Sequence, residues 1–266
     1  MSDIKKSMAH IAALEELAQL NSPIHKLQPS VKLIFTVIYL VTIISYPPGS
    51  ISGLLPFLFF QVVVMTLGDI PIKPILSRLL FALPFPLFTG ISNVILSREI
   101  VFYIGDFGIT DGVISFTSIL LKTILTVTAV LLLIATTNLY DLIYTLIQLK
   151  IPSVIAIQLM MTYRYISVLL NEISVMYHAY RLRAPKEKGI KLKDMGPFLG
   201  QLIIRSFDRS ERIYQAMKCR GFDGTVAYSR RSNVKKVDIL FLIIMVSILV
   251  ILRFVNVSEV IGNLFL

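Results

Sequence analysis

Long apolar runs separated by short polar breaks fill the first half of the chain, and one more apolar run lies near the C-terminus. A helix needs about 17–25 apolar residues to cross a bilayer. Five runs approach or reach that length, and they cover Val31–Tyr46, Ile51–Leu67, Ile75–Leu96, Val113–Thr137 and Val237–Phe254. The third run contains Pro84, Pro86 and Gly90, so we expect its helix to kink or break there. The pattern predicts an all-α, polytopic membrane protein with about five transmembrane helices.

Residues 138–236 follow a different pattern, with polar stripes at helical spacing. Ile151–Arg183 predicts one long helix. Its polar stripe consists of Arg164, Ser167, Asn171, Ser174, His178 and Arg181. Pro197–Arg220 predicts a second helix, with arginines on the side opposite an apolar stripe. Ser206 and Ser210 lie in that apolar stripe, and small residues let two helices approach closely. We therefore expect two to three long amphipathic helices outside the bilayer, two of which cross at these serines.

The distribution of lysine and arginine predicts the orientation of the chain. We divide the chain into an N-terminal segment (1–30), four transmembrane helices (31–137), the amphipathic region (138–236) and a last transmembrane helix with its tail (237–266). With the N-terminus inside, most basic residues are cytoplasmic, including Lys5, Lys6, Lys26, Lys73, Arg230 and Arg231. The opposite side holds only Arg98 and the boundary residue Arg253. The N-terminus and residues 138–236 are thus predicted to be cytoplasmic.

Composition narrows the possible functions. The chain has 266 residues, 55% of them hydrophobic and 16% charged, and a mean hydropathy of +0.77, which is outside the range of soluble domains. One cysteine excludes an internal disulfide, and three scattered histidines lack metal-ligand spacing. We recognise no nucleotide-binding or hydrolase motif. The sequence therefore predicts no catalytic site, cofactor or metal. The net charge of +10 comes without an aromatic stacking platform, so nucleic-acid binding is not expected.

Both long predicted helices end with an arginine beside a helix breaker. The two candidate sites are Arg183 with Ala184, and Arg220 with Gly221; Arg181 and Arg212 add positive charge nearby. This density of charge exceeds what helix capping needs, and it predicts docking to an acidic partner. The alternative is that these arginines only favour the negative C-terminal end of the helix dipole.

Other charged residues have simpler interpretations. Arg205 and Arg209 could form a solvated face, and Asp208 and Arg212 are spaced for an i,i+4 ion pair. Lys122 lies in an apolar run, where ionisable groups are costly and often functional, but its long side chain can reach the interface. We expect a structural role for Lys122, as for Arg164 on the polar stripe.

The most specific stretch is Arg205–Gly224, which reads RSFDRSERIYQAMKCRGFDG. Three shorter stretches accompany it in order along the chain: Leu20–Leu33; Thr136-Thr137 with Asp141-Leu142; and Ile151-Pro152 with Tyr163-Arg164-Tyr165. Together they resemble the T component, the transmembrane energy-coupling subunit, of energy-coupling-factor (ECF) transporters. The similarity is greatest to the cobalt branch, CbiQ, and it extends over essentially the whole chain.

The resemblance implies a non-catalytic subunit of an ABC importer in a prokaryotic plasma membrane. In this family two short X-Arg-X motifs dock to a pair of cytoplasmic ATPase subunits, and a separate membrane subunit captures the substrate, here cobalt. The motifs would be Leu182-Arg183-Ala184 and Cys219-Arg220-Gly221. The first departs from the usual Ala-Arg-Gly form, so Arg181 could replace Arg183 in it.

Two alternative functions remain at this point. The chain could be a T component for nickel or vitamin uptake. A more distant alternative is an intramembrane enzyme, which would need polar or acidic residues converging inside the spans. The predicted spans contain almost none, and Asp238 lies at the boundary of the last one.

Overall fold

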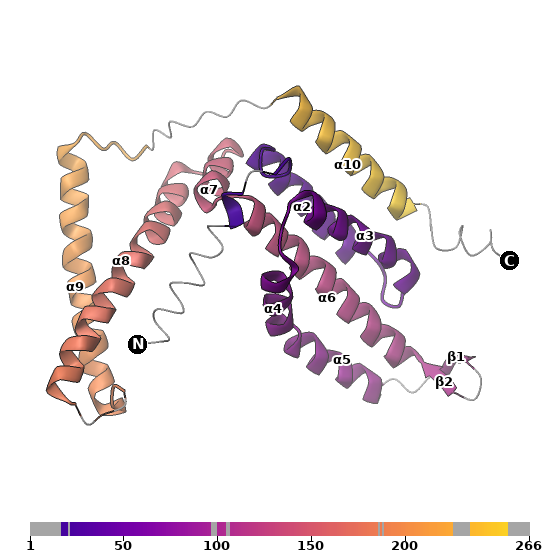
Figure 1. Cartoon of the computed structure of the whole chain (residues 1–266), viewed down its shortest axis with the longest axis horizontal. Coiled ribbons are helices and arrows are strands. Elements are labelled where there is room, and N and C mark those ends of the chain that lie inside the picture. Colours follow the sequence, from indigo (N-terminus) through magenta and orange to yellow (C-terminus); the bar gives the residue numbers. More distant parts are fainter. Residues whose placement is uncertain are drawn as a thin grey trace. The chain divides into compact units, whose positions relative to one another are not determined.

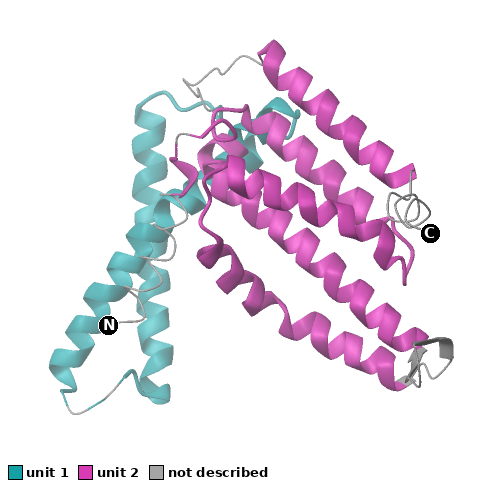
Figure 2. Cartoon of the chain, turned by 45° about the vertical axis from the view of Figure 1, so that its right-hand side comes forward, with its two compact units in different colours: residues 1–13, 143–231 teal, residues 14–142, 232–266 magenta. Residues whose placement is uncertain are grey.

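The structure is a computed structural model that describes residues 17–20, 22–96, 100–104, 107–185, 187, 189–225 and 235–254. These parts of the chain are mainly helical (Figure 1). The chain divides into two compact units, residues 14–142 with 232–266, and residues 1–13 with 143–231 (Figure 2). We call the first unit the bundle. The predictions for Lys5, Lys6, Arg98, Arg230 and Arg231 lie outside the described residues.

The bundle helices follow the predicted apolar runs to within a few residues. They are α2 (Pro29–Ile44), α3 (Ile51–Leu67), α4 (Ile72–Ala82), α5 (Pro84–Leu96), α6 (Asp111–Thr136) and α10 (Lys236–Phe254), and the short α7 (Leu139–Gln148) follows α6. The third apolar run is broken as predicted: α4 and α5 are bent by 48° at their junction. Pro84 begins the second segment, a position where its missing N–H costs no helical hydrogen bond.

Helix length and composition identify the candidate membrane spans within the described ranges. Helices α6 and α10 are long and apolar enough to span, and the bent pair α4–α5 qualifies when it is counted as one span. Helices α2 and α3 are apolar but have only 16 and 17 residues. Helix α8 (Ser153–Arg183), which we predicted to lie outside the bilayer, also qualifies. The all-α, multi-pass membrane class is confirmed. By this measure the described residues contain three candidate spans, or four with the bent pair.

A small β-hairpin lies between α5 and α6, in the gap between the third and fourth apolar runs. Strands β1 (Ile100–Ile104) and β2 (Phe107–Thr110) pair antiparallel, and Ile104 is opposite Phe107. It does not alter the helical class.

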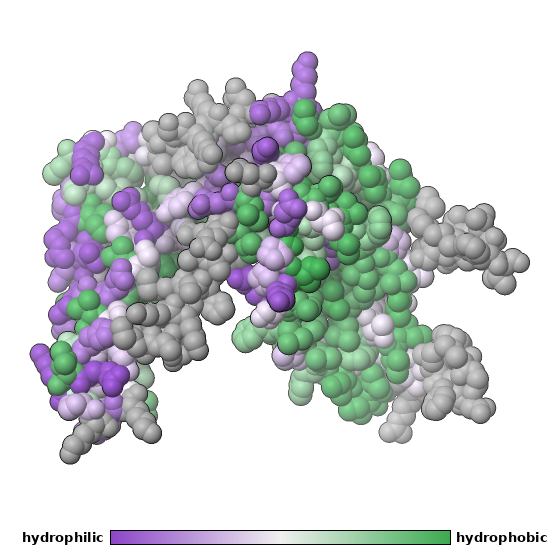
Figure 3. Space-filling model, in the orientation of Figure 1, coloured by the Kyte–Doolittle hydropathy of each residue, from purple (hydrophilic) through white to green (hydrophobic). Residues whose placement is uncertain are grey.

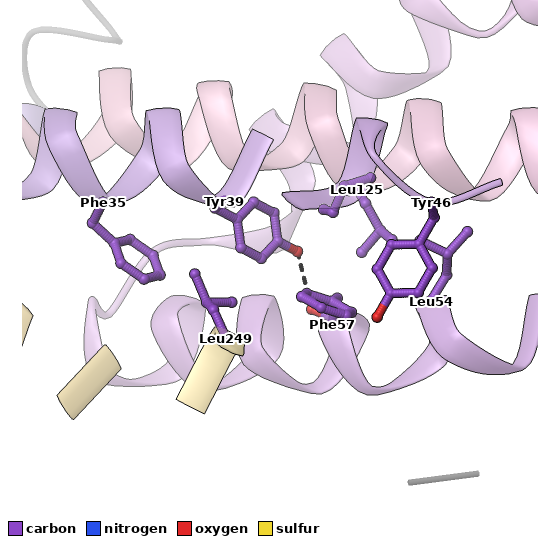
Figure 4. Packing of buried hydrophobic residues seen from close by; sticks show 8 residues of the cluster. Phe35, Tyr39, Tyr46, Leu54, Phe57, Leu125 and Leu249 are labelled. Atoms are coloured by element: carbon purple, nitrogen blue, oxygen red, sulfur yellow. Dashed lines mark hydrogen bonds between the residues drawn. The ribbon is translucent and has the colours of Figure 1, made fainter. Parts of the chain in front are cut away.

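The bundle core combines aromatic and aliphatic side chains from α2, α3, α6 and α10 (Figure 4). Phe57 is fully buried, and its ring meets Tyr39 and Tyr46 edge-on, with centroids 5.9 and 5.7 Å apart. The Tyr39 hydroxyl donates a hydrogen bond to the Phe57 carbonyl at 3.1 Å. Leu125 and Leu249 close the cluster from α6 and α10. Such interlocked packing joins the four helices into one body.

Helix α5 lies very close to α6 at Gly90. A Cβ atom at this position would overlap the ring of Phe116. The absence of a side chain at Gly90 therefore permits the contact between the two helices. The sequence had suggested only a contribution of this glycine to the helix break.

Two cations converge on the C-terminal end of α2. Lys122 Nζ donates to the Tyr46 carbonyl at 2.6 Å, and Arg253 Nη2 donates to the Ser45 carbonyl at 3.2 Å. The Arg253 guanidinium also lies over the Tyr46 ring, 4.2 Å from its centre. These contacts satisfy carbonyls that have no partner within the helix, so Lys122 has a structural role.

Candidate partner-binding surface

Helices α8 and α9 (Leu192–Cys219) form an antiparallel hairpin, joined by residues 184–191 (Figures 1 and 2). Helix α8 has 31 residues, so it is about 45 Å long at 1.5 Å per residue. Helix α9 begins at Leu192, five residues before the predicted start, and Pro197 lies inside it. Arg183 and Arg220 end the two helices at opposite ends of the hairpin.

The hairpin buries very little of its own surface. Among the described residues, Ala156 is the only buried residue of α8, and α9 has none. Exposed apolar side chains on α9 include Leu199, Ile203 and Phe207. Figure 3 shows hydrophobic side chains over the bundle helices and many hydrophilic ones over the hairpin. Long helices that pack so little on each other leave most of their surface for other contacts.

The turn end of the hairpin is fastened by polar contacts. The Tyr180 hydroxyl donates to Asp194 Oδ2 at 2.8 Å and accepts the Lys191 N–H at 3.3 Å. Lys191 also forms an ion pair with Glu187 at 2.6 Å. The hydrogen bond and charge of Glu187 raise the pKa of Lys191. These contacts hold the start of α9 beside the end of α8.

The two helices are tied again at mid-length by an ion pair, in which Arg205 Nη1 lies 2.7 Å from Glu172 Oε1. Ser206 lines a hollow beside this pair, and Ser210 lines a second hollow shared with the first half of α8. Their hydroxyls donate to carbonyls of their own helix, those of Leu202 and Phe207. Both serines thus lie toward α8, and their polar atoms need no partner there.

Arg220 is held by a helix-ending turn of well-defined geometry. Gly221 adopts φ +78°, its N–H donates to the Lys218 carbonyl at 2.9 Å, and the Phe222 N–H donates to the Met217 carbonyl at 3.1 Å. This pair of bonds is the Schellman motif, in which glycine tolerates the left-handed backbone. The sequence had indicated Gly221 as a helix breaker. The turn fixes the backbone of Arg220 and leaves its side chain exposed.

The next residues extend that turn. The side chain of Asp223 accepts the Thr225 N–H at 2.9 Å and the Thr225 hydroxyl at 2.6 Å. These hydrogen bonds lower the pKa of Asp223, because they stabilise its ionised form. We call the hairpin ends at Arg183 and Arg220 the two tips. The Ser153 hydroxyl donates to the Gly224 carbonyl at 3.4 Å, which ties the Arg220 tip to the start of α8.

Helix α8 ends at the Arg183 tip without the Schellman motif that ends α9. The Ala184 N–H donates to the Tyr180 carbonyl at 2.9 Å, but Ala184 has φ −130°, outside the helical range. Pro185 follows and has no N–H to continue the helix. Leu182 is 84% exposed, and Arg181 and Arg183 are exposed beside it.

The four arginines proposed from the sequence for docking form no ion pair with any residue that the structure describes. This holds for Arg181, Arg183, Arg212 and Arg220. Their guanidinium groups are exposed to solvent at the two ends and along one side of the hairpin. The arrangement leaves each group free to form charge-assisted hydrogen bonds with carboxylates.

A polar cluster in the bundle contains residues whose importance the sequence reading missed. Lys32 is buried, and its Nζ donates to the Thr136 carbonyl at 2.7 Å and the His25 carbonyl at 3.2 Å. His25 Nε2 lies 2.9 Å from the Leu17 carbonyl and 3.2 Å from the Ala135 carbonyl. Carbonyls only accept, so Nε2 carries a proton. The signal was present in the resemblance, which includes the stretches around His25, Lys32 and Thr136.

Asp238 belongs to the same end of the bundle. It is buried and accepts the Lys235 N–H at 2.9 Å and the Gln28 N–H at 3.4 Å. The first bond caps the start of α10, as an acidic residue in the first turn does. Asp238 therefore joins α10 to the segment before α2, which is a structural role. The described residues contain no group of three or more His, Cys, Asp or Glu that could hold a metal ion.

Comparison with known proteins agrees with the resemblance seen in the sequence. The family model CbiQ, described as cobalt transport protein, matches residues 20–231. The chain belongs to this family. The match includes both arginine tips and His25, Lys32 and Thr136 of the polar cluster.

Individual relatives cover most of the chain at low identity. An uncharacterized protein of Methanocaldococcus jannaschii is 26% identical over 250 residues, which is 90% of this chain and 84% of the relative. The energy-coupling factor transporter transmembrane protein EcfT of Streptococcus equi is 26% identical over 220 residues, 77% of this chain and 81% of the relative. The protein of the same name from Bacillus subtilis is 27% identical over 221 residues, 76% and 82% respectively.

Proposed function

We propose that this CbiQ-family chain is the energy-coupling subunit of an ECF-type ABC importer. It would transmit motion from a pair of cytoplasmic ATPase subunits to a membrane subunit that captures the substrate. The chain itself would be non-catalytic. The observation that carries this proposal is the hairpin, which presents two exposed arginine tips at opposite ends of two stiff helices. Neither tip arginine forms an ion pair with a described residue.

The geometry of the tips suits a partner with two equivalent docking sites. Each tip combines an exposed arginine with a defined helix end, Gly221 after Arg220 and Ala184-Pro185 after Arg183. Because the tips are separated by the length of α8, about 45 Å, one small protein domain cannot easily cover both. A pair of similar subunits can take one tip each, with acidic groups opposite Arg183 and Arg220.

The hairpin could carry motion because its two helices are long and continuous. A change in the separation of two docked subunits would shift the tips, and stiff helices would move as rods about their contacts. The exposed apolar side chains of α9, such as Ile203 and Phe207, offer a surface for the membrane subunit. The shift would then change the position of the captured substrate.

Cobalt ion is the cargo that the family description favours. The relatives named EcfT carry no substrate in their names, so nickel and vitamins are the alternative cargoes. Purification in mild detergent, followed by identification of the membrane protein that accompanies the chain, decides among them. A nickel- or vitamin-binding companion would exclude cobalt and leave the coupling role intact.

The coupling role is tested with the double variant Arg183→Ala/Arg220→Ala. We expect the variant to fold and to lose its ATPase partners on purification, since the two charges that hold them are gone. The control is Lys73→Ala/Arg78→Ala, which removes two cations from α4 in the bundle. Unchanged ATPase recovery and substrate uptake in the tip variant would refute the proposal.

The predicted orientation belongs to the same proposal. The N-terminus and the hairpin would lie on the cytoplasmic side, where the ATPases are. The basic residues on the predicted inner side support this assignment.

A further inference from the structure

Three arginines of α9 line a polar hollow at the middle of the hairpin. The hollow has a volume of about 290 Å³, and its walls are Leu169, Glu172, Arg205, Ser206, Asp208, Arg209 and Arg212. Arg205, Arg209 and Arg212 are spaced by four and three residues, so they lie on one side of the helix. This side is distinct from the exposed apolar side with Ile203 and Phe207.

Two of these guanidinium groups have no ionic partner in the described part of the chain. Arg205 is paired with Glu172, but Arg209 and Arg212 form no ion pair. The i,i+4 pair between Asp208 and Arg212 that the sequence suggested is not formed either. The hollow therefore presents two available cations and one available carboxylate.

This mixture of charges favours a protein side chain over a phosphate group. A phosphate can accept hydrogen bonds but would be repelled by the carboxylates of Glu172 and Asp208 in the same hollow. A protein segment can place an Asp or Glu against Arg209 and Arg212, and a basic or amide group against Asp208. The chemistry thus fits a partner surface in which acidic residues predominate.

The position of the hollow between the two tips indicates which partner binds there. Leu169 precedes Arg183 by fourteen residues, and Ser206 precedes Arg220 by the same number. Each tip is therefore about 21 Å from the hollow along its helix. Two similar subunits that hold one tip each would meet opposite this point.

We propose that the hollow is a third docking contact, which receives an acidic side chain from the ATPase pair near the boundary between its two subunits. This inference rests on the proposed function, because it needs the ATPases at the tips. It adds a contact between the hairpin and the boundary of the two subunits, separate from the contacts of the two tip arginines.

Photo-crosslinking tests the location. The photoreactive amino acid p-benzoylphenylalanine replaces Leu169 in the assembled complex in native membranes, with Val175, an exposed apolar residue of α8 outside the hollow, as the control position. We expect the probe at 169 to attach to an ATPase subunit near its boundary with the other, and the probe at 175 to give at least fivefold less of that product. Attachment at 169 to lipid, or to neither ATPase subunit, would overturn the inference.

Charge removal tests the chemistry. We expect Arg209→Gln/Arg212→Gln to bind the ATPase pair roughly tenfold more weakly, the effect of losing one charge-assisted contact. Arg164→Gln/Lys73→Gln removes the same charge from exposed positions outside both the hollow and the tips and should bind within twofold of wild type. Equal affinity of the two variants would overturn the inference.

These experiments distinguish failure of the third contact from failure of the proposed coupling function. If the tip variant Arg183→Ala/Arg220→Ala loses the ATPases while the hollow variant retains wild-type affinity, the third contact is wrong and the coupling role stands. If wild-type protein binds no ATPase at all, the coupling role itself fails, and the third contact fails with it.

Discussion

The bundle and the hairpin are both built from long helices, yet they use their side chains in opposite ways. In the bundle, Phe57 is fully buried among rings and aliphatic groups from four helices. In the hairpin, Phe207, which is also a phenylalanine in the middle of a long helix, is 68% exposed. Two ion pairs among the described residues, Arg205–Glu172 and Lys191–Glu187, lie in the hairpin region and not in the bundle.

The bundle is stabilised by contacts within itself, whereas the hairpin has most of its surface available for other molecules. Buried charged groups of the bundle, such as Lys32 and Asp238, form hydrogen bonds within it. The arginine tips of the hairpin form no ion pair with any described residue, and apolar side chains of α9 such as Phe207 are exposed. Substitutions in the bundle should therefore change stability, and substitutions in the hairpin should mainly change assembly.

The largest expected effect comes from removing a core ring. Phe57→Ala should lower the free energy of unfolding by about 3 kcal/mol or more, because it leaves a cavity between interlocked helices. Phe207→Ala, the matched change in the hairpin, should stay within about 0.5 kcal/mol. Thermal unfolding followed by circular dichroism in the same detergent measures both. Similar losses in the two variants would erase the distinction between bundle and hairpin.

A smaller effect is expected at the Arg220 tip. Gly221→Val should cost about 1–2 kcal/mol locally, because a β-branched side chain is strained at φ +78°. The turn would lose its shape, so ATPase recovery should fall as it does without Arg220, with the bundle melting normally. Gly200→Val is the control within α9, where the backbone is not left-handed and an added Cβ meets no atom within 4 Å. If the valine at 221 left ATPase recovery intact, the shape of this turn would be irrelevant to docking.

The smallest effect should follow from breaking the ion pair at mid-hairpin. Glu172→Gln removes the charge opposite Arg205, and such exposed pairs contribute about 0–1 kcal/mol. We expect little change in unfolding and weaker alignment of the two helices, measurable as a broader distance distribution between spin labels on α8 and α9. A loss of several kcal/mol would mean that the hairpin has a core of its own after all.

The sequence predicted the elements better than their contacts. Apolar runs and breakers such as Pro84 and Gly221 placed most helix ends within a few residues, because those signals are local. The start of α9 was missed, since Gly196 and Pro197 are usually found outside helices. Strands as short as β1 and β2 give too little pattern to recognise.

Long-range polar contacts could not be predicted at all from local patterns. Lys32 and Thr136 are 104 residues apart, and Gln28 and Asp238 are 210 apart. No spacing rule connects such positions, and only the family resemblance drew attention to some of them. For the candidate partner surface, the sequence predicted the helix ends at Arg183 and Arg220, and α8 and α9 end there. It could not show that these lie at opposite ends of one hairpin, with a charged hollow midway between them.

The most direct test of the account uses Cys219, the only cysteine of the chain, which is exposed and adjacent to Arg220. A membrane-impermeant maleimide is applied to intact cells and to inside-out vesicles, with and without the ATPase pair. The account predicts labelling only in the vesicles, and strong protection when the ATPases are bound. Labelling of intact cells, or the same rate in vesicles with and without the ATPases, would contradict it.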